Sequence, residues 1–493
     1  MQPALPSRRH LLQTLGGASL TPAFGQSARR PNILFIMSDD HAAHAISAYG
    51  SKINRTPNID RLARGGMRFD NCFVTNSICT PSRAVIMTGQ YSHMNGVRTL
   101  NDAFDPARDN VAKQLQAAGY ATAIIGKWHL HSQPTGFDYW NILPGQGAYN
   151  NPAFIENGVE KKHDGYCTDL IGDFSLEWLK RRDKSKPFFL MCHHKAPHRA
   201  WQPAARYRNL LASETVPEPP TLYDNYENRG QGARDARMRV GEHMTKTGLK
   251  TDPPPGLAAG ELRKWAYQLY IKDYLRCVQS VDDNVGRLLD YLADEEIEND
   301  TLVIYTSDQG FFLGDHGWYD KRFMYEESLR MPFLVRYPGG VRAGGSNQDI
   351  VLNLDFAETF LDYAGVKPPA SMQGCSLRSL LEGKTPRDWR QSMYYRYWMH
   401  LADHYVPAHY GVRTARYKLI YFYGQPLGTR GGLAEPKPPY WELFDLQKDP
   451  REMRSVYHDA GYAGIVQRMK TELARLQKRY GDEPWRVPET APQ

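Results

Sequence analysis

The sequence predicts an α/β fold, in which a largely parallel sheet is flanked by helices and is followed by a smaller C-terminal α+β subdomain. Short apolar runs recur through the first two thirds of the chain, and helical patterns separate them. Such runs are typical of strands that are buried on both faces of a sheet. After about Gln391 the pattern changes to aromatic strands and one amphipathic helix. The four apolar runs are residues 33–37, 121–125, 188–191 and 302–305.

Two helices can be placed between these strands. Residues 56–65 begin with a Thr cap and a Pro in the first turn, and they end on a Gly that stops a helix. A longer helix is expected over residues 262–292. Polar residues follow each apolar run, and the carboxyl ends of parallel strands are where such folds bind ligands. Residues 209–255 are polar and rich in Gly and Pro, so we expect them to cross the mouth of the active site.

The C-terminal subdomain is predicted from two aromatic strands, residues 392–397 and 417–422, and a final helix. An apolar stripe of the helix would pack on a small four-stranded sheet. Residues 424–440 are expected to form a surface loop. We therefore predict a catalytic domain over residues 31–388 and a subdomain over residues 389–485. The stripe consists of Ile465, Met469, Leu473 and Leu476.

Composition excludes several classes of protein. Of the 493 residues, 23% are charged and 41% hydrophobic, which are globular values, and no apolar run approaches the roughly 20 residues of a membrane span. The sequence contains no basic run interleaved with aromatic residues, which is the pattern that would indicate nucleic-acid binding. The net charge of +7 is a mild excess, compatible with a polyanionic substrate but equally with an ordinary surface. Six cysteines are too few for a disulfide scaffold, and their pairing cannot be assigned from spacing.

The N-terminus resembles a twin-arginine export signal. Arg8 and Arg9 precede a short apolar stretch that ends near Leu20, and small residues follow. We expect residues 1–28 to be a signal peptide and the mature protein to be periplasmic or secreted. An ordinary basic tail is the alternative.

A motif at residues 79–89 carries the chemistry. Cys79-Thr80-Pro81-Ser82-Arg83 opens an apolar helix that ends in Thr88-Gly89. These residues resemble the type I sulfatase signature, in which the cysteine is converted to formylglycine by a formylglycine-generating enzyme. A hydrated aldehyde offers one hydroxyl to attack sulfur and another to expel sulfate afterwards, an exit that no unmodified side chain provides. A helix N-terminus would also favour the anionic substrate. A buried structural cysteine is the alternative.

Two acidic pairs predict a metal site. Asp39-Asp40 and Asp308-Gln309 each follow an apolar run, and they supply a set of hard oxygen ligands that suits Ca²⁺. The resemblance implies the same ligands, together with an oxygen on residue 79. Mg²⁺ is the alternative ion, and solvated turns are the alternative interpretation.

Further catalytic residues are expected around this centre. Arg83 lies one helical turn after Cys79, so it could reach back to the nucleophile. The resemblance implies that Lys127 binds the sulfate and that His129 accepts a proton from the second hydroxyl. It also implies that His198 and Lys321 contact the sulfate and the bridging oxygen, and either could protonate the leaving group.

A finer resemblance concerns the substrate. Residues 311–318 and 321–330 are similar to the bacterial N-acetylglucosamine-6-sulfatase group, which belongs to the alkaline-phosphatase-like fold. The resemblance implies hydrolysis of a sulfated carbohydrate, with 6-O-sulfated N-acetylglucosamine in glycosaminoglycan or mucin glycans as the first guess. The alternatives are another sulfated polysaccharide or an aryl or alkyl sulfate, a phosphonate or phosphodiester hydrolase, and an inactive glycan-binding homologue. The candidate substrate residues are His316, Trp398, His404 and His409.

Overall fold

A computed structural model describes residues 30–483. The expected signal peptide, residues 1–28, lies outside these residues and stays a prediction. Residues 31–483 belong to one compact unit, so the expected boundary between residues 388 and 389 also stays a prediction. No helix among the described residues is long and apolar enough to cross a membrane.

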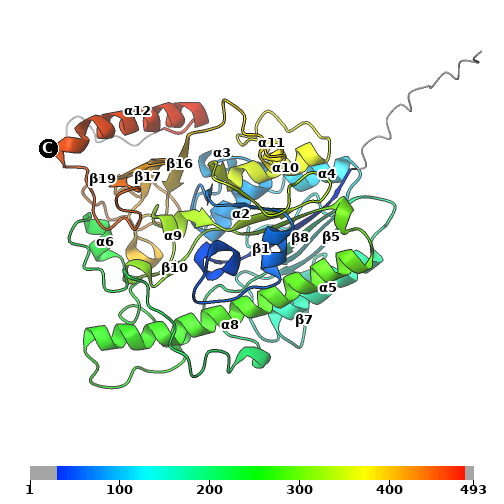
Figure 1. Cartoon of the computed structure of the whole chain (residues 1–493), viewed down its shortest axis with the longest axis horizontal. Helices are drawn as coiled ribbons and strands as arrows, with labels where there is room; N and C mark the ends of the chain where they lie inside the picture. The colour runs from blue at the N-terminus through cyan, green and yellow to red at the C-terminus, as the bar shows by residue number, and fades with distance from the viewer. Residues whose placement is uncertain (1–29, 484–493) are drawn as a thin grey trace, which may run out of the picture. The chain divides into compact units, whose positions relative to one another are not determined.

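A ten-stranded mixed sheet forms the centre of this unit (Figure 1). Its five middle strands, β9-β1-β8-β4-β5, run parallel, whereas the pairs toward both margins are mostly antiparallel. In spatial order the strands are β14 (Gly345–Asn347), β2 (Met67–Phe69), β13 (Phe333–Arg336), β9 (Thr301–Ser307), β1 (Asn32–Ser38), β8 (Phe188–His193), β4 (Ala121–Lys127), β5 (Tyr139–Leu143), β6 (Ala153–Glu156) and β7 (Val159–Lys162).

The four predicted strands are confirmed, and they are neighbours in space. The apolar runs became β1, β4, β8 and β9, all of them buried almost throughout. Ser38 at the end of β1 is in register with Ser307 at the end of β9. The polar residues that follow these strands therefore meet at one edge of the sheet.

Helices cover both faces of the sheet. Figure 1 shows α8 and α5 along one face, with α2, α4 and α10 on the other. The predicted long helix is confirmed as α8. The polar segment at residues 209–255 contains only two short helices. It packs on the hairpin of β10 (Phe312–Leu313) and β11 (Tyr319–Asp320), where Val240 N donates to Gly317 O at 2.8 Å. The helices are α1 (Ile59–Arg64), α2 (Cys79–Thr88), α3 (Ser92–Asn95), α4 (Val111–Ala117), α5 (Cys167–Arg181), α6 (Gln231–Asp235), α7 (Lys246–Leu249), α8 (Ala259–Asp294), α9 (Glu326–Leu329), α10 (Phe356–Tyr363), α11 (Arg378–Leu381) and α12 (Ala463–Tyr480).

The predicted helix at residues 56–65 is present but begins later, at Ile59. The Thr56 side chain does not cap it. Instead, the carboxylate of Asp282, from the middle of α8, accepts hydrogen bonds from Asn58 N at 3.1 Å and Ile59 N at 2.8 Å. A residue more than two hundred positions away thus caps this helix.

The C-terminal part is a four-stranded antiparallel sheet packed by α12, as predicted. Met469, Leu473 and Leu476 are buried on that sheet. Residues 424–439 form the expected loop before the last strand. Its strands are β16 (Ser392–Tyr397), β17 (His409–Thr414), β18 (Tyr417–Phe422) and β19 (Tyr440–Asp445), and short pairings elsewhere involve β3 (Cys72–Phe73), β10 (Phe312–Leu313), β11 (Tyr319–Asp320), β12 (Arg330–Met331) and β15 (Val351–Leu352).

Candidate active site

The two acidic pairs converge at the carboxyl edge of the sheet. Asp39 and Asp40 follow β1, and Asp308 follows the adjacent β9. Carboxylate oxygens of the three residues lie within 4.8 Å of one another. Asp40 has a φ of 66°, and its N–H donates to Asp308 Oδ1 at 3.2 Å. A left-handed conformation is uncommon for a non-glycine residue, and such strain is concentrated at functional sites.

Cys79 is the first residue of α2, and the whole helix is buried. Its Sγ lies 3.6 Å from Asp39 Oδ1 and 3.7 Å from Gln309 Nε2. Burial, reinforced by the negative charge of Asp39, raises the pKa of the thiol to about 12. An unmodified thiol with that pKa is a poor nucleophile at neutral pH, because the thiolate is the reactive form. An unmodified Cys79 would therefore be unreactive at neutral pH.

Each of the three carboxylates is bound by its own buried cation. Lys127, at the end of β4, donates to Asp39. Lys321 Nζ lies 2.7 and 2.8 Å from the two oxygens of Asp40. Arg83 Nη2 donates to Asp308 Oδ2 at 2.9 Å.

Arg83 thus differs from expectation. We expected it to reach back toward residue 79, but its guanidinium is held by Asp308 and by the carbonyl oxygen of Lys127, at 2.6 Å. Asp308 binds the guanidinium of Arg83 because the Asp308 carboxylate is buried and needs a charged partner. Arg83 therefore orients a predicted metal ligand.

The centre retains unsatisfied affinity for a cation. Burial and the proximity of Asp39 raise the pKa of Asp308 to about 7, and burial also raises the pKa of Asp40. Burial opposes ionisation of Asp39 as well, but Lys127 and neighbouring cations lower its pKa well below the usual value. Gln309 Oε1 is buried and has no hydrogen-bond partner among residues 30–483. Three carboxylates and an unused amide oxygen fit the hard ligand set of Ca²⁺ or Mg²⁺.

Two predicted histidines lie beside this centre. His129 Nδ1 is 3.3 Å from Thr80 Oγ1, next to Cys79 in the chain, and burial together with Lys127 lowers its pKa to about 2. His198 Nε2 is 3.8 Å from Asp40 Oδ2, and its Nδ1 lies 2.7 Å from the Arg199 carbonyl oxygen. Burial lowers the pKa of His198 well below its usual value. Both rings are therefore neutral at pH 7, and a neutral imidazole can accept a proton.

The structure adds two residues that our sequence analysis did not place in the site. Gln146 Oε1 accepts from Lys127 Nζ at 2.6 Å. Lys195 is buried, its Nζ lies 4.9 Å from the centre of the Tyr149 ring, and burial lowers its pKa to about 8. No sequence signal identifies Gln146, which lies in a loop. Lys195 could have been found, because it is only three residues before His198.

Three of the four candidate substrate residues are buried against other parts of the protein. His316 has no exposed surface, and its Nδ1 lies 3.2 Å from Asp224 Oδ2. His409 is buried, with its ring 4.8 Å from that of Phe422. The guanidinium of Arg396 lies 3.6 Å from the centre of the Trp398 ring and covers it.

These expectations are corrected because the aromatic sheet and the network around Asp224 use these rings for packing. Only His404 stays close to the centre. Its Nε2 lies 3.1 Å from Asp320 Oδ2, directly before Lys321 in the chain.

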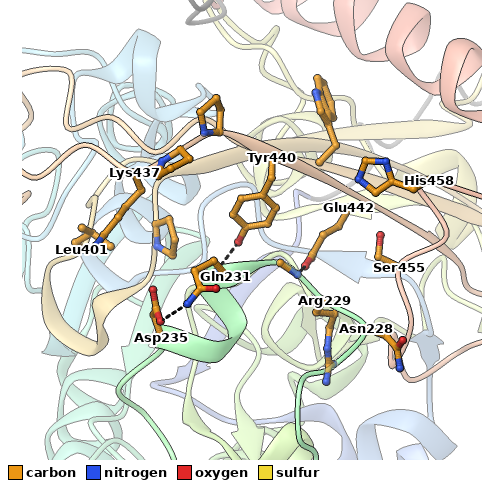
Figure 2. Close-up of a pocket in the computed structure, with 16 residues that line it drawn as sticks. Asn228, Arg229, Gln231, Asp235, Leu401, Lys437, Tyr440, Glu442, Ser455 and His458 are labelled. Carbon is orange, nitrogen blue, oxygen red and sulfur yellow. Dashed lines mark hydrogen bonds between the residues drawn. The ribbon is translucent and has the colours of Figure 1, made fainter. Parts of the chain in front are cut away.

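A cavity of about 430 Å³ lies elsewhere, between the segment around α6 and the C-terminal sheet. Figure 2 shows Gln231, Tyr440 and Glu442 among the residues that line it. Among the described residues, none of those predicted to be catalytic or to bind metal lines this cavity.

Comparisons with known protein families agree with this geometry. The family model described as Sulfatase matches residues 31–366. A second model, described as N-sulphoglucosamine sulphohydrolase, C-terminal, matches residues 314–479. Together the matches cover both the strand-end cluster and the C-terminal sheet.

Curated relatives are similar over nearly the whole chain. An N-acetylglucosamine-6-O-sulfatase from Bacteroides thetaiotaomicron is 43% identical over 517 aligned residues, which cover 96% of this chain and 90% of the relative. An arylsulfatase from Clostridium perfringens is 27% identical, with 90% of this chain and 94% of the relative covered.

Solved structures are also similar. One that is 43% identical has a TM-score of 0.88 and covers 92% of this chain and 98% of its own; it was solved in complex with its substrate D-glucosamine-2-N,6-O-disulfate. A phosphonate monoester hydrolase of Agrobacterium radiobacter has a TM-score of 0.72 at 22% identity, with 92% and 96% of the chains covered. At that identity the second likeness concerns the fold alone.

Proposed function

This chain belongs to the sulfatase family and is a sulfuric ester hydrolase, and on that premise we propose that it removes the 6-O-sulfate of N-acetylglucosamine, or of a closely related glucosamine, in sulfated glycans. The observation that carries the proposal is the meeting of Cys79, the acidic cluster and the cations Lys127 and Lys321 at one edge of the sheet. The 43% identical relative and the similar structure with its disulfated glucosamine support the choice of substrate.

The proposed chemistry needs two groups beyond the amino-acid side chains. Formylglycine made from Cys79 would supply the attacking hydroxyl, and Ca²⁺ would neutralise the sulfate oxygens. The ion would be held by Asp39, Asp40, Asp308 and Gln309, beside residue 79. Mg²⁺ is the alternative ion.

The chain's own residues then have separable tasks. Lys127 and Lys321 are cations that can bind sulfate oxygens, and Arg83 keeps Asp308 oriented. Neutral His129 accepts the proton whose removal re-forms the carbonyl and releases sulfate. His198 and Lys321 both lie against Asp40. The Lys321 ammonium can protonate the departing sugar oxygen directly, whereas the neutral His198 ring would first have to take up a proton before it could do so.

A direct experiment tests this function. Peptide mass spectrometry of the mature protein should show the peptide containing residue 79 lighter by about 18 Da, as expected when a thiol becomes an aldehyde. The same preparation should release sulfate from N-acetylglucosamine-6-sulfate faster than from its 3-sulfated isomer, and dialysis against a calcium chelator should abolish that release. An unmodified cysteine in fully active protein would refute the nucleophile, and equal rates for the isomers would refute the substrate.

Two alternatives remain distinguishable. A phosphonate or phosphodiester hydrolase would turn over an aryl phosphate diester faster than an aryl sulfate. A glycan-binding homologue without activity would carry an unmodified Cys79 and bind sulfated sugars without releasing sulfate. No observation of the site favours either over a sulfatase.

We also propose export by the twin-arginine route, on the basis of Arg8, Arg9 and the apolar stretch that follows them. Replacing both arginines by lysine should retain the precursor in the cytoplasm. Fractionation of cells would detect it, and unchanged export of the variant would contradict the proposal.

A further inference from the structure

Two exposed arginines lie beside the catalytic residues and have no role in the proposed reaction. Arg199 directly follows His198, and its guanidinium carbon is 5.9 Å from the centre of the Tyr319 ring. Tyr319 precedes Asp320 and Lys321. The first arginine therefore lies at the edge of the catalytic centre.

The second arginine is connected to the first through His404. The rings of Tyr319 and His404 are 5.4 Å apart. His404 also holds the backbone of Arg237, which donates to the His404 carbonyl oxygen at 2.6 Å, while its own carbonyl lies 3.0 Å from His404 Nδ1. The guanidinium carbon of Arg237 lies 4.5 Å from the centre of the Tyr405 ring. Arg199, Tyr319, His404, Arg237 and Tyr405 thus form an unbroken series of contacts, here called the strip, in which Tyr319 is buried and the two arginines are exposed.

The backbone of this strip is held in an unusual conformation. His404 and Tyr405 are consecutive non-glycine residues with φ values of 67° and 57°. Such residues are strained and persist only where the surroundings over-determine them. The contacts of His404 with Asp320 and with the Arg237 backbone provide that support.

The charges of the strip are available to a ligand. Both Arg199 and Arg237 are exposed, and neither forms an ion pair with a carboxylate of residues 30–483. Lys437, at the far end, lies 5.1 Å from the centre of the Tyr405 ring but is paired with Glu435 at 2.6 Å. The two arginines therefore supply the net positive charge. Stacking on tyrosine orients a guanidinium and leaves its N–H groups free to bind an oxyanion.

We propose that Arg199 and Arg237 bind a second anionic group, on a sugar adjacent to the one whose sulfate is hydrolysed. This inference rests on the proposed function and deepens it: the enzyme prefers oligosaccharides that carry further sulfate or carboxylate groups over an isolated sulfated sugar. The strip runs from the catalytic edge toward Lys437, which also lines the cavity in Figure 2.

The test compares two substrates with two arginine variants. Arg199→Gln and Arg237→Gln should each raise KM about fivefold for a multiply sulfated tetrasaccharide, with kcat unchanged, because one exposed charge-assisted contact is lost. KM for the 6-sulfated monosaccharide should not change. High salt should remove the difference between variant and wild type, since the contacts are exposed to solvent.

Arg208→Gln is the matched control, because Arg208 is exposed, directly precedes the excursion that contains Arg237 and forms no ion pair among the described residues. It should leave both KM values unchanged. Equal effects of Arg237→Gln on both substrates, no effect on either, or an equal effect of Arg208→Gln on the tetrasaccharide would overturn the inference.

A binding measurement separates this inference from the proposed function. In the Cys79→Ala background, calorimetric titration with the same tetrasaccharide should show about fivefold weaker binding when Arg237→Gln is added. If the wild-type protein released no sulfate, the proposed function would be refuted, but the binding difference would still support the inference about the two arginines. If sulfate release were normal and binding did not differ, only the inference that the two arginines bind a second anionic group would be overturned.

Discussion

The catalytic cluster and the cluster around Glu326 are both buried networks of acids and bases, but they arrange their charges differently. In the catalytic cluster, oxygens of three aspartates lie within 4.8 Å of one another. Around Glu326, by contrast, cations surround one carboxylate: Arg330 at 2.6 Å, Arg413 at 2.8 Å and Lys418 at 2.9 Å. Lys418 then bridges to Glu452 at 2.7 Å.

The difference distinguishes a binding site from a structural network. In the catalytic cluster the three carboxylates converge although each also has its own cation, and like charges brought together in a buried place are costly unless something binds between them. In the other network a cation, Lys418, lies between the two carboxylates Glu326 and Glu452. Convergent carboxylates therefore indicate where to look for a ligand, and burial or ion-pair number does not.

The largest expected effect concerns the nucleophile. Cys79→Ala should reduce sulfate release by at least about 10⁴-fold, because no other side chain can take its place. The melting temperature should stay close to that of the wild type, since only one buried sulfur atom is lost. Both are measured on purified protein, and substantial turnover by the variant would disprove the mechanism.

The second prediction breaks the structural network. Glu326→Gln leaves Lys418 and Arg413 buried with one negative charge fewer, so we expect a loss of about 3 kcal/mol in the free energy of unfolding. Urea titration measures that loss. Activity per folded molecule and calcium affinity should be retained, and loss of calcium affinity would show that the two clusters are not independent.

The third prediction concerns the equivalent acid-to-amide change in the catalytic cluster. Asp308→Asn should weaken calcium binding by roughly a hundredfold, because a charged ligand is lost and Arg83 loses its partner. Calorimetric titration with calcium measures the affinity. Glu452→Gln, the same change in the structural network, is the control and should leave calcium affinity unchanged. An unchanged affinity in the Asp308 variant would argue against its role as a ligand.

The smallest effect is a pH dependence of stability. Burial, opposed by Lys418, raises the pKa of Glu452 to about 7. The folded state therefore binds this proton more tightly than the unfolded state. Protonated Glu452 thus adds to the free energy of unfolding below about pH 4.5, and this contribution is lost as pH rises through 7. We expect this loss to be about 2 kcal/mol. The difference between wild type and Glu452→Gln in unfolding free energy at pH 4.5 and pH 7.5 measures it, and parallel pH profiles would contradict it.

Much of the site could be predicted from residues that are close in sequence. The apolar runs before Asp39 and Asp308 predicted adjacent parallel strands, because such runs can be buried only inside a covered sheet. The placement of Cys79 at a helix N-terminus followed in the same way from Pro81 and the apolar residues after it.

Contacts between distant segments could not be predicted. Asp282 replaces Thr56 as the cap of α1, and Asp308 takes the guanidinium that we expected near residue 79. His316 and His409 were expected to contact substrate, but they pack within the protein. Sequence patterns record what a residue can do, whereas its partner depends on which segment folds against it.

By itself, the sequence determined the strand and helix types, the order of the elements and the residues able to bind a cation or form a nucleophile, since these depend on local periodicity and side-chain chemistry. Only the tertiary structure decided which charges meet. The register of β1 against β9 brings three aspartates together, the packing of α2 directs Arg83 to Asp308, and the support from His404 places Arg237 near the catalytic edge. The physical reason is that buried charges must find partners across the fold, and the chain's local sequence does not specify them.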